Sequence, residues 1–219
     1  MRIVDILFYT MTGIECLLLI PFIFNYKSLD KPGKWAYYYL ISSIFFAVGS
    51  LLIAKLYRNT LLFGSIMNGV QFIILTVYYY LLIEKPFFKL LIKILLTLAI
   101  FIFLLDFFKL EGINSYNSIF AAIRTIILLS YGSIFFFQLI FDDRLIKESI
   151  FINALPNFWF NAGLFVYLCG SFLFYLAFNF FLRHSLDNAN IAQSLTFVAG
   201  IFEAILFYIG IMKAKKQRA

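Results

Sequence analysis

Three ionisable residues stand inside long apolar stretches of this sequence: Glu15, Arg124 and Glu203. A charged group at membrane depth is costly, so each such residue is a functional hypothesis by default. A carboxylate and a guanidinium attract strongly where the dielectric is low, and they join through two hydrogen bonds. We therefore expect Arg124 to pair with one or both glutamates, as a ligand or proton site or as a fastening between helices.

The positions of these residues within their stretches place them at similar depth. At about 1.5 Å per helical residue, Glu15 and Glu203 lie roughly 18 Å from the outer end of their helices and Arg124 about 12 Å. Asn68 and Gln71 are three residues apart on one helical face and fall at a similar depth. These five residues predict one intramembrane polar cluster, in which the two amides are either packing contacts or part of a cavity open to the outer side.

Residue sets that support catalysis are missing from the sequence. The single histidine, His184, cannot build a His-rich zinc site, and the H-E-x-x-H motif is absent. Serine and threonine residues in the apolar stretches have no neighbouring base that would activate them. Walker and dinucleotide glycine motifs do not occur. We expect a protein that is not an enzyme and that has no metal and no cofactor.

The most distinctive segment is NALPNFWFNAGLFVYLCGSFLFYLAFN, which starts at Asn153. Its pattern F-W-F-N-x-G-x-x-x-Y-x-x-G-x-x-x-F includes Trp159, Asn161, Gly163, Tyr167 and Gly170. Gly163 and Gly170 are seven residues apart and share a helical face, where small residues let another helix approach closely. We interpret this motif mainly as a packing surface, with ligand binding as the alternative.

This pattern resembles that of a group of small, mostly uncharacterised seven-helix bacterial membrane proteins. Some members are similar to the membrane sensor modules that accompany histidine kinases. The overall layout agrees along the whole chain, but the diagnostic residues are confined to the segment from Phe158 to Phe174. In that group, acidic residues often occur where this chain has Gln71 and Arg124, so the resemblance implies a different polar layer here.

Composition identifies the class of protein that must hold these residues. The chain has 219 residues, of which 63% are hydrophobic and 13% charged, against roughly 45–50% and about 25% in soluble proteins. Runs of roughly 20 apolar residues cross a hydrocarbon core of about 30 Å as helices. We expect one all-α domain, 1–219, with seven transmembrane helices at about 3–24, 35–57, 60–83, 87–108, 116–141, 157–182 and 190–212.

Basic residues predict the orientation, because they are retained on the cytoplasmic side. The spans place twelve of them on one side: Lys27, Lys31, Lys34, Lys85, Lys89, Lys93, Arg144, Lys147, Lys213, Lys215, Lys216 and Arg218. The other side has five: Arg2, Lys55, Arg58, Lys109 and Arg183. We therefore expect the N-terminus outside and the C-terminus in the cytoplasm. The net charge of +7 is then a topology signal, not a nucleic-acid surface.

Three functional hypotheses fit these observations. The first is a non-catalytic receptor-like or signalling module of the bacterial inner membrane, surrounded by membrane lipids, which binds a ligand of unknown identity. The loops are short, so its signal has to pass through a protein partner in the membrane or the cytoplasm. The second is a small transporter with three helices, a linker helix and three more helices. The third is a structural subunit of a larger membrane complex.

Overall fold

The computed structural model describes residues 3–57, 59–112, 116–142, 151–184 and 186–218. Within its helices, the side chains at 57, 173, 177–184, 186–189, 217 and 218 are not described. Several residues used for the topology prediction lie outside the described residues: Arg2, Arg58, Arg144 and Lys147. The side chains of Arg183, His184 and Arg218 also lie outside this description.

Within the described ranges, seven helices are long and apolar enough to cross a membrane. They are α1 (Ile3–Phe24), α2 (Lys31–Tyr57), α3 (Leu61–Leu82), α4 (Pro86–Leu105), α5 (Ser118–Ile140), α7 (Pro156–His184) and α8 (Leu186–Arg218). The π-helical turn η2 (Asp106–Leu110) continues α4, and the 3-10 turns η1 (Tyr26–Ser28) and η3 (Ile152–Ala154) precede α2 and α7. The prediction of an all-helical chain with seven membrane-length helices is confirmed.

Helices α2 and α8 extend furthest beyond the predicted apolar spans. Helix α2 begins at Lys31 rather than near residue 35, because Asp30 caps it: Asp30 Oδ1 accepts a hydrogen bond of 2.8 Å from the Gly33 amide. Helix α8 continues to Arg218 rather than ending near residue 212. Lysine and arginine are good helix formers, and they are favourable in a last turn, so the basic end of the chain prolongs the helix.

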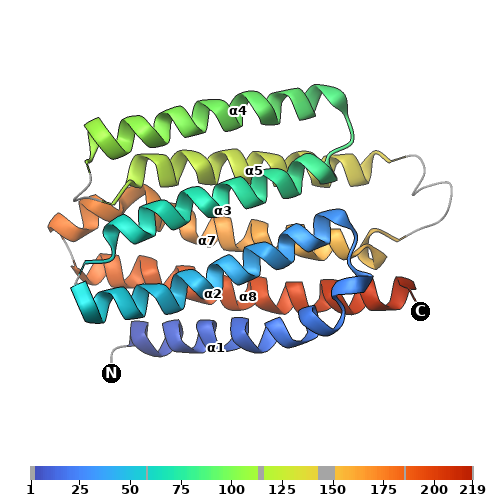
Figure 1. Cartoon of the computed structure of the whole chain (residues 1–219), viewed down its shortest axis with the longest axis horizontal. Coiled ribbons are helices and arrows are strands. Elements are labelled where there is room, and N and C mark those ends of the chain that lie inside the picture. Colours follow the sequence, from blue (N-terminus) through green and yellow to red (C-terminus); the bar gives the residue numbers. More distant parts are fainter. Residues whose placement is uncertain (1–2, 58, 113–115, 143–150, 185, 219) are drawn as a thin grey trace.

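The helices form a bundle in which α1 and α4 occupy opposite edges (Figure 1). Helix α7 packs against both α5 and α8, α2 packs against α3, and α1 packs against α8. We call the end where α1 begins the N-terminal end of the bundle, and the end where α8 finishes the C-terminal end. The two chain termini therefore lie at opposite ends of the bundle (Figure 1).

Glycines allow the close contact between α7 and α8. A Cβ atom placed on Gly170 would lie 2.5 Å from the Cβ of Ala199. A Cβ on Gly163 would lie 2.9 Å from the Phe207 ring and 3.0 Å from the backbone oxygen of Glu203. Two helices in contact at these positions have no room for a side chain, as in other small-residue interfaces between membrane helices.

Aromatic rings fill the half of the bundle near the C-terminal end. The rings of Phe22, Phe160 and Phe207 lie with centroids 5.4 to 6.2 Å apart, and all three side chains are fully buried. Tyr39 adds a fourth ring, 6.3 Å from Phe207. This packing closes the C-terminal half, and the site described next lies in the other half.

Candidate functional site

A cavity of about 250 Å³ lies in the N-terminal half of the bundle, between α1, α2, α3, α7 and α8. It reaches the α2–α3 turn at Thr60. Four residues singled out in the sequence line it: Glu15, Asn68, Gln71 and Tyr167. Aromatic rings form much of the remaining wall, from Phe8, Phe46, Tyr116, Phe174, Tyr175 and Phe197. We call this space the central cavity.

Glu15 lines the central cavity, and one of its carboxylate oxygens has no hydrogen-bond partner among the described residues. Its side chain is 4% exposed, and its Oε1 accepts a hydrogen bond of 2.9 Å from Ser43 Oγ on α2. The second oxygen, Oε2, is buried and has no hydrogen-bond partner among the described residues. Buried polar atoms are nearly always satisfied in native proteins, so this oxygen is a position where a bound molecule could supply the missing partner.

Gln71 is another polar residue of the central cavity whose side chain is open. Its side chain is 6% exposed, and none of the hydrogen bonds formed within the described residues involves its amide. Asn68, on the same face of α3, differs because its Nδ2 donates to the Tyr116 hydroxyl at 2.7 Å. The amide of Gln71 is therefore available to a ligand, whereas the Asn68 side chain fastens the cavity wall.

Arg124 does not form the ion pair that the sequence suggested. No ion pair links it to Glu15 or Glu203, although all three side chains are described. Instead its Nη1 donates to the backbone oxygen of Asn68 at 3.1 Å, and its guanidinium lies 5.1 Å from the ring centroid of Tyr175. The reason is the arrangement of the helices: α5 does not adjoin α1 in the bundle (Figure 1). Residues at the same depth on helices that do not adjoin are too far apart to form an ion pair.

Arg124 thus contacts a wall of the central cavity without lining the cavity itself. Tyr175, which lies over its guanidinium, stacks on Tyr116 with ring centroids 6.4 Å apart. The hydroxyls of Tyr175 and Tyr167 are 3.1 Å apart. The wall formed by Tyr116, Tyr167 and Tyr175 is therefore held by a cation–π contact and by hydrogen bonds from α3 and α7.

Glu203 lies beside Glu15, on the side of the cavity toward the C-terminal end. Both carboxylates line a void of about 10 Å³ between α1, α2 and α8, and they interact electrostatically. Glu203 is 4% exposed, and its Oε1 has no hydrogen-bond partner among the described residues. The structure therefore brings the two glutamates together with each other and with Tyr39, not with the arginine.

The motif residues Trp159 and Asn161 are placed away from the central cavity. Asn161 Oδ1 accepts a hydrogen bond of 2.8 Å from the Tyr79 hydroxyl, and its Nδ2 donates to the Gly132 backbone oxygen at 3.2 Å. Asn161 thereby joins α3, α5 and α7. The indole nitrogen of Trp159 donates to the Asn153 backbone oxygen at 2.8 Å, which holds the turn before α7.

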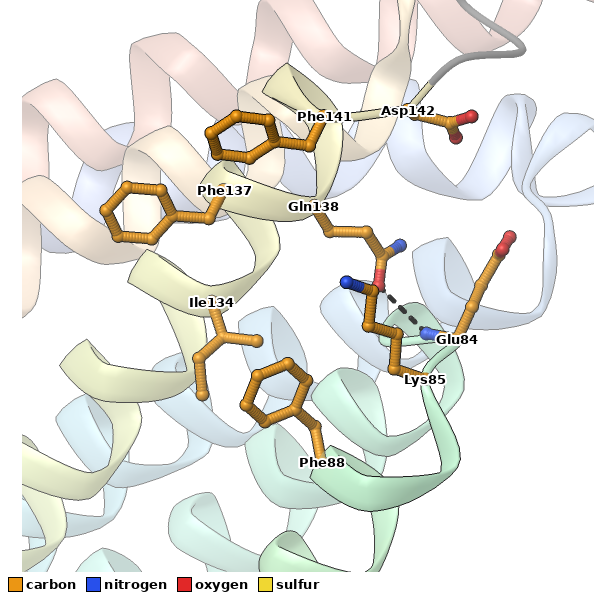
Figure 2. Close-up of a pocket in the computed structure, with 8 residues that line it drawn as sticks. All are labelled: Glu84, Lys85, Phe88, Ile134, Phe137, Gln138, Phe141 and Asp142. Carbon is orange, nitrogen blue, oxygen red and sulfur yellow. Dashed lines mark hydrogen bonds between the residues drawn. The ribbon is translucent and has the colours of Figure 1, made fainter.

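A second cavity, of about 550 Å³, lies between the start of α4 and the end of α5 (Figure 2). The amide of Gln138 ties this region together, because its Oε1 accepts from the Glu84 backbone at 2.9 Å and its Nε2 donates to the Leu82 oxygen at 3.4 Å. Figure 2 shows Phe88 and Ile134 facing each other across the groove, with the Glu84 carboxylate turned away from them. The exposed rings of Phe137 and Phe141 make this a lateral groove at the bundle surface.

Several residues with a structural or site role were not singled out in the sequence. Asp106, which does not line the central cavity, is fully buried at the start of η2, where its Oδ2 accepts a hydrogen bond of 2.9 Å from the Phe120 amide. It is an acidic residue inside a predicted span, so the rule that selected Glu15 would have found it. The roles of Ser43, Tyr116 and Tyr175 had no such signal, because hydroxyl and aromatic residues are common in every span.

Among the described residues, no group of three or more His, Cys, Asp or Glu side chains is placed to hold a metal ion. Comparison of the chain with protein-family models, with curated proteins and with solved structures gives no match. The resemblance to seven-helix sensor-like proteins stays a prediction. The function has to be argued from the central cavity.

Proposed function

We propose that this protein is a non-catalytic, receptor-like module of the bacterial inner membrane that binds a small molecule in the central cavity. In this proposal the N-terminus lies outside, as the distribution of basic residues indicates. The cavity is then reached from the outer side, and the basic end of α8 faces the cytoplasm. A protein partner receives the signal there, because the chain has only short segments between its helices.

The observation that supports ligand binding is that polar groups without hydrogen-bond partners in the described part of the chain, Glu15 Oε2 and the Gln71 amide among them, belong to residues that line the central cavity. Glu15 and Gln71 are each more than nine-tenths buried, and both line a space large enough for a small molecule. Ligand sites typically combine apolar and aromatic walls with a few placed polar groups. The central cavity has this composition, and the lateral groove between α4 and α5 has no comparably buried polar group among its described lining residues.

The closed half of the bundle supports a receptor rather than a channel. Beyond Glu203, the space toward the C-terminal end is filled by the rings of Phe22, Phe160 and Phe207. A molecule in the central cavity is therefore held between helices. Because α7 lines the cavity and also packs against α5 and α8, occupancy of the cavity acts directly on the interfaces of the bundle.

Transport is the second candidate function, and one observation favours it. Glu203 adjoins Glu15 between the central cavity and the closed half of the bundle. Buried acidic residues in membrane helices often mark an ion or substrate pathway. A transporter would release the bound molecule on the far side, so uptake of that molecule into proteoliposomes distinguishes this candidate from a receptor.

A variant that fills the cavity tests the proposed function. Gly64 lines the central cavity, and a Cβ placed there makes only ordinary contacts, 3.8 Å from Phe46 and from Tyr116. The Cβ of Gly64→Leu is therefore accommodated, and the rest of its side chain should fill part of the adjoining cavity. Gly13→Leu is the matched control, because a Cβ at Gly13 meets nothing within 4 Å.

The measurement is mass spectrometry of small molecules retained by the full-length protein in nanodiscs after incubation with a cell extract. We expect one compound to be retained by the wild type and by Gly13→Leu, and to be lost from Gly64→Leu. No retained compound, or equal retention by Gly64→Leu, would refute a binding function for this cavity.

The orientation has its own test. A cytoplasm-dependent reporter fused after Ala219 should be active, and a reporter that needs the outer side should be active when inserted in the segment 111–116. The reverse pair of results would place the central cavity on the cytoplasmic side and overturn the outer-side entry of the ligand.

A further inference from the structure

The charge of the central cavity indicates what kind of molecule fits it. Among the described residues that line the cavity, Glu15 is the one charged side chain, and none is basic. The nearby Arg124 does not line the cavity and is engaged by the Asn68 backbone oxygen and the Tyr175 ring. Among its described lining residues, the cavity therefore has a carboxylate on one wall and no basic side chain to balance it.

The position of Glu15 makes a positive partner favourable. A carboxylate at membrane depth is costly unless it is paired. Ser43 supplies one hydrogen bond to Oε1, and Oε2 remains without a partner among the described residues. A donor with a positive charge would satisfy Oε2 and neutralise the carboxylate in a single contact, and charge-assisted hydrogen bonds of this kind are the strong ones.

The remaining walls suit an organic cation better than a metal ion. Metal sites need several oxygen, nitrogen or sulfur ligands around one point, and no cluster of three acidic, histidine or cysteine side chains is found in the described part of the chain. The rings of Phe46, Tyr116 and Tyr167 line the cavity instead. Aromatic rings attract ammonium groups and pack against apolar substituents.

The volume of the central cavity and the amide of Gln71 indicate the size and the polar groups of the ligand. A cavity of about 250 Å³ is below the size that holds drug-sized ligands, which is roughly 300–1,000 Å³. The Gln71 amide oxygen can accept a second N–H from the same ammonium group or a hydroxyl from its substituent. The molecule is therefore small, with a charged nitrogen at one end.

We infer that the central cavity binds a small organic ammonium ion with an apolar or aromatic substituent, whose nitrogen contacts Glu15 and whose substituent packs against the ring-lined wall. This inference rests on the proposed function, because it specifies the ligand of the same cavity. It does not depend on whether the bound molecule is sensed or transported.

The test compares charged probes with neutral probes of the same shape, using thermal unfolding of the full-length protein in nanodiscs at millimolar probe concentration. The pairs are 2-phenylethylammonium with 2-phenylethanol, and tetramethylammonium with tert-butanol. We expect at least one ammonium probe to raise the unfolding temperature of the wild type, and its neutral partner to have little effect. The affinity of Glu15→Gln for that ammonium probe should be lower than that of the wild type by about 30-fold or more, since the variant cannot form the buried charge pair with the probe.

Two variants complete the test. Glu84→Gln removes an exposed carboxylate outside the central cavity and should leave the response to the ammonium probe unchanged. Gly64→Leu should abolish the response to the ammonium probe.

If a neutral probe, or a neutral or anionic compound from the extract, binds wild type but not Gly64→Leu, the cation inference is wrong and the binding function stands. Failure of both ammonium probes to stabilise the wild type also refutes the inference. If no compound of any charge binds, the proposed function fails with it.

Discussion

Replacing Gly170 with alanine tests the close contact between α7 and α8. The new Cβ would lie 2.5 Å from the Cβ of Ala199, and both atoms are fixed to helix backbones, so neither can turn aside. The helices must separate by roughly 1 Å to restore normal contact distances. Overpacking of this kind costs about 1–3 kcal/mol, and alanine returns about 1 kcal/mol through its higher helix propensity. We expect Gly170→Ala to lower the free energy of unfolding by a net amount of about 2 kcal/mol. This is the upper end of the difference between the two contributions, because the two Cβ atoms that meet are rigidly held.

The assay is reversible unfolding of the full-length protein in mixed micelles, followed as the fraction folded against denaturing detergent. Gly13→Ala is the control, because nothing lies within 4 Å of its added Cβ, and it should be neutral or stabilising by up to about 1 kcal/mol. The exchange variant Gly170→Ala with Ala199→Gly should recover near wild-type stability, since one Cβ is again absent from the contact. Equal stability of Gly170→Ala and Gly13→Ala, or no recovery in the exchange variant, would refute the contact.

Three further outcomes follow from the buried polar groups. Asn161→Leu should lower stability by about 2 kcal/mol because it strands the Tyr79 hydroxyl, and the double variant with Tyr79→Phe should be less destabilised than Asn161→Leu alone, as a double-mutant cycle would measure. Arg124→Leu and Glu203→Gln should change the free energy of unfolding additively within about 0.5 kcal/mol in the double variant, because these residues form no ion pair. A double variant that is more stable than Arg124→Leu alone would instead support an ion pair between them. Glu15→Gln should unfold at an equal or higher temperature without ligand, since it removes an unpaired buried carboxylate; a clear loss of stability would contradict this.

The helices could be predicted because hydrocarbon thickness sets their length. Each apolar run had to supply roughly 20 residues, and the helices α1 and α3 end within a residue or two of the predicted spans at 3–24 and 60–83. Two of the ends that differ from the predicted spans are decided by polar chemistry. Asp30 starts α2 before the apolar run begins, and the basic residues after 212 prolong α8.

For the candidate site, the sequence predicts how far along its helix each residue lies, but it does not predict which helices are neighbours. Rise per residue converts position in a span into depth, and Glu15, Asn68 and Gln71 do lie around one cavity. Which helices adjoin is decided by packing between faces, and a single sequence of apolar residues leaves that order open. Arg124 therefore has a suitable depth for an ion pair, yet it lies between α3 and α7 against Asn68 and Tyr175.

Arg124 and Glu15 are both deeply buried, but they differ in their relation to the central cavity. Arg124 is 2% exposed, and its guanidinium contacts a carbonyl oxygen and an aromatic ring. Its Nε has no hydrogen-bond partner among the described residues, but Arg124 does not line the central cavity. Glu15 is almost as buried and its Oε2 likewise lacks a partner among the described residues, but Glu15 does line the central cavity. A buried carboxylate that served only to fasten helices would be better satisfied by the chain itself. An open carboxylate lowers stability, and proteins keep such groups where binding needs them.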